Sequence, residues 1–177
     1  MEIYKYFDQI QTELLDHPWQ EIEKKYYDLC SKSAGEEQAK RIRNIDLDSF
    51  QSKLNDALHV LLQTADKDST AAIYFEYDMD NDWQSILFIC DDYSTLSEED
   101  DDWASDWISE VGGPDLKEFA RIYAENGFNG TDKALWTTLY LVVRTVTVFG
   151  RVVKSVKTNI PICIGFHDQD PIMRIQE

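Results

Sequence analysis

The sequence predicts an α+β fold in which a small, mainly antiparallel sheet of three or four strands packs against several helices. Two observations support this class. Apolar residues recur at helical spacing up to about residue 61, and the period then changes to two. A second helical region separates two early strands from one or two late ones, an order typical of α+β domains.

The composition predicts one ordered domain over residues 1–177. Hydrophobic residues make up 43% of the chain, and its 7 glycines and 4 prolines form no long flexible tract. A chain of 177 residues buries about two thirds of the surface that its unfolded form exposes. Within this domain we expect a helical hairpin at 1–35 and an α+β core at 45–177.

Three helices are predicted before the first strand. Apolar residues at positions i, i+4, i+7 and i+11 place the first helix over 3–14. Pro18 ends this helix and suits the first turn of the second, which completes the hairpin. The charged segment 36–44 is expected to be a connector. Asp46 then suits the cap of a third helix over 47–61.

A β-hairpin is predicted next, because residues of alternating polarity fill 71–77 and a second apolar run fills 85–90. The turn between these strands is 78–82. The segment 91–102 is expected to be an acidic loop. A short helix over 103–111 follows, and the Gly-Gly-Pro sequence after it ends that helix.

The last third of the chain is expected to hold two helices and one or two strands. The first helix has its inward-facing residues between 116 and 123 and ends near Gly127. The segment 131–157 has helical spacing and no turn signal, which favours a helix, but 142–149 is rich in β-branched residues, so a strand there stays open. Alternation over 160–166 predicts a third strand, and 172–175 a short fourth.

The charge is distributed very unevenly. Between Lys67 and Lys117 the chain has 15 Asp and Glu residues and no Lys, Arg or His, within a total formal charge of −17. A pI near 4.4 argues against binding to nucleic acid or to anionic membranes, because both require clustered cations. With no apolar leader or membrane-length run, and with three widely spaced cysteines expected to be buried and reduced, we expect a cytoplasmic protein.

One acidic pattern resembles the start of a calcium-binding loop. Asp78, Asp80 and Asp82 stand at positions one, three and five of such a loop. Trp83 stands where the loop requires Gly, and Ile89 stands where it requires Glu. We therefore expect a solvated turn without a metal ion.

Enzyme chemistry has weak support in the sequence. His167, Asp168 and Asp170 follow the third strand and could hold a divalent ion, although Asp is also an ordinary turn residue. The chain has no Gly-x-Ser-x-Gly elbow, no Cys-x-x-Cys pair and no phosphate-binding glycine loop. We expect no cofactor and no catalysis, and the alternative is a metal-dependent enzyme with these three residues and the carboxylates of the 78–82 turn as ligands.

A protein-binding surface is the favoured reading of the acidic segment. Large aromatic residues lie between its acids, and such residues anchor protein interfaces. Trp103 and Trp107 are the expected anchors, and the alternative for either tryptophan is that it fills the core. The alternative for the acids is that they serve solubility alone. The residues expected to contact a partner are Asp78, Asp80, Asp82, Trp83, Glu98, Asp100, Asp101, Asp102, Trp103, Asp106 and Trp107.

Three segments carry a resemblance to a known group of proteins: 73–77 (Ile-Tyr-Phe-Glu-Tyr), 102–107 (Asp-Trp-Ala-Ser-Asp-Trp) and 162–168 (Ile-Cys-Ile-Gly-Phe-His-Asp). Over roughly residues 45 to 175, the chain resembles a bacterial family of small α+β domains of unknown function. Many such domains resemble immunity proteins of polymorphic toxin and contact-dependent inhibition systems. The resemblance implies no catalytic residues.

Taken with the charge, the resemblance implies an immunity protein that neutralises a cognate toxin. The partner would be a basic protein toxin, expected to be a nuclease domain, because surfaces that handle nucleic acid are cationic. Inhibition would be steric and electrostatic. The alternatives are the metal-dependent enzyme and an acidic adaptor or scaffold protein without a toxin partner. The oligomeric state is left open.

Overall fold

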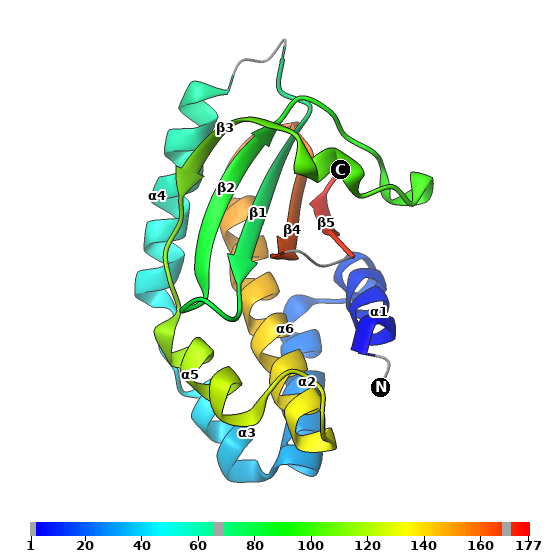
Figure 1. Ribbon diagram of the computed structural model, residues 1–177, viewed down its shortest axis with the longest axis vertical. Helices are drawn as coiled ribbons and strands as arrows, with labels where there is room; N and C mark the ends of the chain where they lie inside the picture. The colour runs from blue at the N-terminus through cyan, green and yellow to red at the C-terminus, as the bar shows by residue number, and fades with distance from the viewer. Residues whose placement is uncertain (1–2, 66–68, 168–170) are drawn as a thin grey trace.

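A mixed sheet covered by helices on one face is the framework of the protein (Figure 1). The computed structural model describes residues 3–65, 69–167 and 171–177. The sheet has five strands in the order β3-β2-β1-β4-β5. Their bounds are β1 Ala72–Asp78, β2 Gln84–Cys90, β3 Trp107–Gly112, β4 Ile162–Phe166 and β5 Met173–Gln176. The α+β class is confirmed, and the predicted sheet lacked one strand, β3.

The pairing of the strands differs from a wholly antiparallel sheet at one place. β1 pairs with β2, β2 with β3 and β4 with β5 in antiparallel fashion, whereas β1 and β4 are parallel. A parallel pair needs a crossover connection. Here the connection between β1 and β4 includes β2, β3 and two helices, so the sequence separation of the paired strands is large.

The predicted helices are confirmed except for the one at 103–111, and one further helix occupies the segment expected to be a connector. The helices are α1 Ile3–Asp16, α2 Trp19–Ala34, α3 Glu36–Arg43, α4 Asp48–Thr64, α5 Lys117–Asn126 and α6 Asp132–Ser155. The prediction of a connector at 36–44 was wrong. Ala39 and Ile42 lie three positions apart, on one face of a helix, and both are buried. Acids in the first turn and bases in the last turn of α3 also suit the helix dipole.

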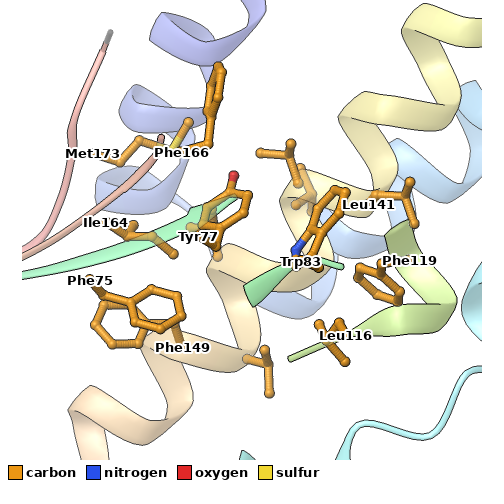
Figure 2. Packing of buried hydrophobic residues seen from close by; sticks show 14 of the residues in the cluster. Phe75, Tyr77, Trp83, Leu116, Phe119, Leu141, Phe149, Ile164, Phe166 and Met173 are labelled. Carbon is orange, nitrogen blue, oxygen red and sulfur yellow. The ribbon is translucent and has the colours of Figure 1, made fainter. Parts of the chain in front are cut away.

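Helix α6 resolves the ambiguity at 142–149, because this segment lies in the middle of a 24-residue helix. The helix is buried along most of its length between the sheet and the helix α2 (Figure 1). Phe149 of α6 stacks on Phe75 of β1, with ring centroids 4.6 Å apart (Figure 2). Burial of apolar side chains on all sides outweighs the weak helix propensity of the β-branched residues.

Several buried polar groups of α6 find hydrogen-bond partners, most of them in neighbouring elements. Thr145 donates a hydrogen bond from Oγ1 to the carbonyl of Leu141, and accepts one from the indole of Trp83 at 3.1 Å. Arg144 donates to the carbonyls of Ile42 and Ile45, where α3 ends. These bonds join α6 to the β1–β2 hairpin and to α3, and they satisfy groups that would otherwise be costly to bury.

The helix predicted at 103–111 was wrong. Its first part forms a short 3₁₀ turn, Asp102–Ser105, and its second part is β3. Trp107, Ile108 and Val111 are aromatic or β-branched and favour a strand. The free edge of β2 provides the backbone partners, from Leu87 opposite Val111 onward. A six-residue segment has too little helical periodicity to compete with such pairing.

Phe149→Ala should lower the free energy of unfolding by about 3 to 5 kcal/mol, because it leaves a cavity beside Phe75 in the main core. Urea unfolding followed by circular dichroism measures this change. Val60→Ala on α4 is the control, because the Val60 side chain is half exposed and its loss should cost under about 0.5 kcal/mol. Equal effects of the two substitutions would contradict the described core.

Candidate functional site

Most acidic residues in the described part of the 68–116 segment lie in two groups at opposite ends of the β1–β2 hairpin (Figure 1). The first group is the turn 78–82, and the second is the loop 91–106, which we call the acidic loop. β1 and β2 have seven residues each, so at about 3.3 Å per residue the groups are about 20 Å apart. The sequence suggested one continuous acidic surface, and the structure divides it.

The turn 78–82 is closed by its own side chains. The Asp78 carboxylate accepts a hydrogen bond from the backbone N–H of Asp80 at 3.0 Å. Asp82 and Trp83 both have left-handed backbone conformations, with φ of 53° and 54°. Asp80 lies beside the hydroxyl of Tyr123, whose pKa is raised by burial first and by Asp80 second. Asp80 and Asp82 are exposed.

Trp83 lies in the core, so the expectation that it contacts a partner is wrong for this structure. Its side chain is fully buried between Tyr77 of β1 and Phe119 of α5 (Figure 2). The indole N–H donates to Thr145 of α6. A left-handed backbone costs about 1 to 3 kcal/mol at a residue other than Gly. Burial of a tryptophan side chain offsets that cost and fixes the turn against α5 and α6.

The acidic loop is held to the sheet by a buried cation, Arg174 of β5. Its guanidinium donates to Asp101 at 2.5 Å and to the carbonyls of Ser94 and Asp100 at 2.9 and 3.2 Å. Asp101 also accepts from the backbone N–H of Ile172 at 3.0 Å. Burial lowers the pKa of Arg174, but the hydrogen bond and charge of Asp101 outweigh burial and raise it overall.

Asp101 therefore has a structural role, because it is the counter-ion of the buried Arg174. Arg174 is 2% exposed, and the Asp101 side chain is 19% exposed. A buried charge needs a partner of opposite sign, and Asp101 supplies it from 73 positions away in the sequence. That Asp101 also contacts a partner stays a prediction.

Further bonds shape the loop around this ion pair. Thr95 donates to the carboxylate of Glu98 from its backbone N–H and its hydroxyl, which lowers the pKa of Glu98. Asp100 accepts from the backbone N–H of Asp102 at 3.0 Å. Glu177 accepts from the hydroxyl of Tyr93 at 2.7 Å and from a backbone N–H of the loop. The loop is thus preformed by contacts with β5 and the last residue.

Trp103 and Trp107, the two expected anchors, lie in different environments. Trp103 is 3% exposed and packs under the loop, with Tyr93 and Tyr74 at its edge. The structure therefore supports the core alternative for Trp103. Trp107 is 49% exposed, and the next residue, Ile108, is 51% exposed. Trp107 rests on Phe88 of β2 with ring centroids 4.7 Å apart, which holds its indole in place.

Exposed carboxylates surround this pair of large apolar residues. Asp102 and Asp106 precede it on the chain, and Glu110 follows it on β3. The other exposed acids of the loop are Asp91, Asp92, Glu98, Glu99 and Asp100. Of the predicted residues, Asp102 and Asp106 lead directly into β3 and Trp107, whereas Glu98 and Asp100 belong to the part of the loop that is held at β5 and Glu177. Ile108 and Glu110 were missed, although their place beside Trp107 in the acidic segment was a usable signal.

A second polar group lies on the outer face of the sheet. Glu76 of β1 lies 2.9 Å from Nδ1 of His167 and accepts a bond from the Tyr74 hydroxyl at 3.4 Å. The pKa of Tyr74 is raised, mainly by burial, so its hydroxyl stays protonated at neutral pH. Sequence reasoning missed Glu76 because its partner depends on the parallel pairing of β1 with β4. A carboxylate that orients an imidazole is not sufficient to define a reaction.

Metal ligation can be assessed for most of the candidate residues. Among residues 3–65, 69–167 and 171–177, no group of three or more His, Cys, Asp or Glu is arranged to hold a metal ion. This covers Asp78, Asp80 and Asp82. Asp168 and Asp170, the expected ligands beside His167, lie outside the described residues. Within the part of the chain that the structure describes, no helix combines the length and apolarity needed to cross a membrane.

Asp101→Asn should lower the free energy of unfolding by about 2 to 4 kcal/mol, because it leaves the charge of Arg174 buried without its counter-ion. Chemical denaturation measures this loss. Asp102→Asn is the matched control, because Asp102 is the neighbouring exposed acid and should change stability by under about 0.5 kcal/mol. An unchanged free energy of unfolding in Asp101→Asn would show that the burial of Arg174 does not depend on this carboxylate.

The three cysteines should resist alkylation at pH 7.5. Burial raises the pKa of Cys30 to about 11 and those of Cys90 and Cys163 to about 12, so the reactive thiolate is scarce at that pH. Mass spectrometry after iodoacetamide treatment should find no adduct in the folded protein and three in urea. Rapid modification of one cysteine in the folded protein would contradict this burial.

No family model, curated protein or solved structure matches this chain. The functional argument therefore rests on the residues and on their arrangement. The arrangement with the most exposed functional groups is the acidic loop together with Trp107, Ile108 and Glu110 of β3. We call this set the loop–β3 surface.

Proposed function

We propose that this protein is an immunity protein that binds a basic toxin domain through the loop–β3 surface and blocks it. One observation carries the proposal. Trp107 and Ile108 are exposed side by side and are bordered by Asp102, Asp106 and Glu110. An apolar centre with a charged rim is the usual anatomy of a protein-binding surface.

The sign of the charge selects the partner. The segment between Lys67 and Lys117 has no cationic residue, so the rim acids of this surface have no local counter-ions in the sequence. A concentrated field of one sign attracts molecules of the opposite sign and speeds their encounter. A basic protein fits this field, and nucleic acid does not.

A nuclease domain is the toxin class that fits best. Its substrate groove is cationic because it holds phosphates, and an acidic protein can occupy that groove by steric and electrostatic complementarity. No catalytic step in the inhibitor is needed. The resemblance of the sequence to bacterial immunity proteins supports the same role and a cytoplasmic location.

The preformed shape of the acidic loop also supports the proposal. Arg174 and Glu177 hold the loop through backbone and side-chain bonds. A loop that is ordered before binding loses less conformational entropy in the complex. Acids that served solubility alone would gain nothing from such ordering, and this distinguishes the proposal from the adaptor and scaffold alternative.

Co-expression tests the proposed role directly. The toxin to test would be the variable C-terminal domain of a large secreted protein, sought in the gene immediately upstream. Co-expression should restore growth of cells that produce this domain, and the two proteins should elute together on size exclusion. Growth arrest without complex formation would contradict the proposed function.

Asp102→Asn with Asp106→Asn should slow association with the toxin domain by about three- to tenfold at 50 mM salt, because rim charges act mainly on the association rate. Stopped-flow fluorescence measures the rate. Asp80→Asn with Asp82→Asn removes the same charge at the other end of the sheet and is the control. Association of the unmodified protein should also slow strongly between 50 and 500 mM salt. Equal slowing of association by the two double variants would show that the position of the acids on the sheet does not affect the rate, and would contradict binding through the loop–β3 surface.

A further inference from the structure

β3 is an edge strand whose residues are all at least partly exposed. In the described part of the chain it pairs with β2 on one side, and its burial pattern contains no fully buried residue. The apolar side chains of Trp107 and Ile108 are therefore presented to solvent together with one edge of the backbone. An edge strand of this kind is a template for pairing with another chain.

The register identifies the backbone groups that point outward. Gly113 donates its N–H to the carbonyl of Ser85 at 2.8 Å, so these two residues form a hydrogen-bonded pair. Hydrogen-bonded and non-hydrogen-bonded pairs alternate along an antiparallel ladder. Val111, opposite Leu87, therefore points its backbone groups toward β2. Glu110 and Gly112 point theirs away from it.

These outward groups are available in the structure. The backbone groups of Glu110 and Gly112 have no hydrogen-bond partner among the described residues. Both residues are exposed. Their spacing of two residues matches the repeat at which an added strand makes its hydrogen bonds. The edge can therefore accept a strand without any rearrangement of β2.

The charges on β3 decide which strand fits. A second copy of this chain would place Asp106 and Glu110 against the same acids, and like charges opposite each other destabilise a strand pair. A segment with Lys or Arg at alternate positions would place cations beside those acids. Trp107 packs on Phe88, and Phe88 lies opposite Glu110, so Trp107 and Glu110 share one face of the sheet and the aliphatic stems of these cations would lie on Trp107.

We propose that β3 binds an extended basic segment of the partner as a sixth strand of the sheet. The inference rests on the proposed function, since it names how the same surface takes its partner. The backbone of Glu110 and Gly112 supplies the hydrogen bonds, the acids supply the preference for a basic sequence, and Trp107 with Ile108 supplies the apolar contact.

A pair of synthetic peptides tests the strand pairing. The probe is an eight-residue peptide of alternating Lys and Val with blocked ends, and the control is the same peptide methylated at alternate backbone nitrogens. The two have equal charge and apolar content, but the control cannot donate the ladder hydrogen bonds. We expect the control to bind at least tenfold more weakly by calorimetry, and equal binding would overturn the proposal.

Hydrogen exchange locates the pairing. Bound to the unmodified probe, the amides of Glu110 and Gly112 should exchange at least tenfold more slowly in nuclear magnetic resonance spectra. Amides of the 78–82 turn should be unchanged. Protection at the turn alone, or at β5, the other outer strand, would overturn the assignment to β3.

A pair of variants separates the backbone bond from the charge. Glu110→Pro removes an outward N–H and a carboxylate, whereas Glu110→Gln removes the carboxylate alone. We expect Glu110→Pro to bind the probe at least fivefold more weakly than Glu110→Gln, and equal affinities would contradict strand addition. Urea unfolding confirms that both variants are folded, and the peptide pair tests the proposal without any substitution.

The outcomes also separate this inference from the proposed function. Growth rescue by the protein with equal binding of both peptides would retain the immunity role and reject strand addition. Discrimination between the peptides without rescue would retain the basic strand as ligand and reject the toxin partner. Dimerisation of the free protein that Glu110→Pro abolishes would assign the edge to a second copy and overturn the inference.

Discussion

A 24-residue helix buried along most of its length needs apolar cover on every side, and helix α6 imposes this constraint on the whole protein. The sheet covers one side through contacts such as Phe75 on Phe149. Helix α2 covers another, where the ring of Trp19 lies so close to Gly150 that a Cβ there would be 2.4 Å from it. The buried polar groups of α6 then require partners, and Trp83 and the end of α3 supply them. The positions of the hairpin and of the N-terminal helices follow from these demands.

A second constraint acts on the outer face of the sheet, where Arg174 is buried. A guanidinium at 2% exposure needs both a counter-ion and acceptors for its N–H groups. Asp101 provides the charge, and loop carbonyls provide further acceptors. A strongly acidic loop, which would otherwise extend into solvent by self-repulsion, is thereby wrapped around a cation at the sheet. The result is an ordered acidic loop that runs from β5, at one edge of the sheet, to β3 at the other.

These two constraints explain why the loop–β3 surface can act as a binding surface. The three tryptophans of the acidic segment lie in three different environments. Trp83 serves the core around α6, Trp103 covers Arg174, and Trp107 stays at the surface on Phe88. β3 carries that exposed tryptophan at the open edge of the sheet. Shape, charge and free backbone groups thus coincide at one place, while the turn 78–82 carries exposed charge over a buried tryptophan.

The sequence by itself determined most of the helices and strands, because their residues repeat at the helical or the strand period over a length sufficient to be recognised. Helix α6 was identified despite its β-branched residues, since no turn signal interrupts it. It also determined the acidic segment and the absence of cations in it. These are local properties of the chain, and the physics that produces them acts between near neighbours.

Tertiary structure alone decided the rest. The short segments α3 and β3 depend on what lies beside them: a core that accepts Ala39 and Ile42, and a free edge of β2. The same holds for the pairing of Glu76 with His167 and of Asp101 with Arg174, whose partners are far away in sequence. No local pattern could show that Trp83 is buried and Trp107 exposed, because burial depends on which distant residues pack against a side chain.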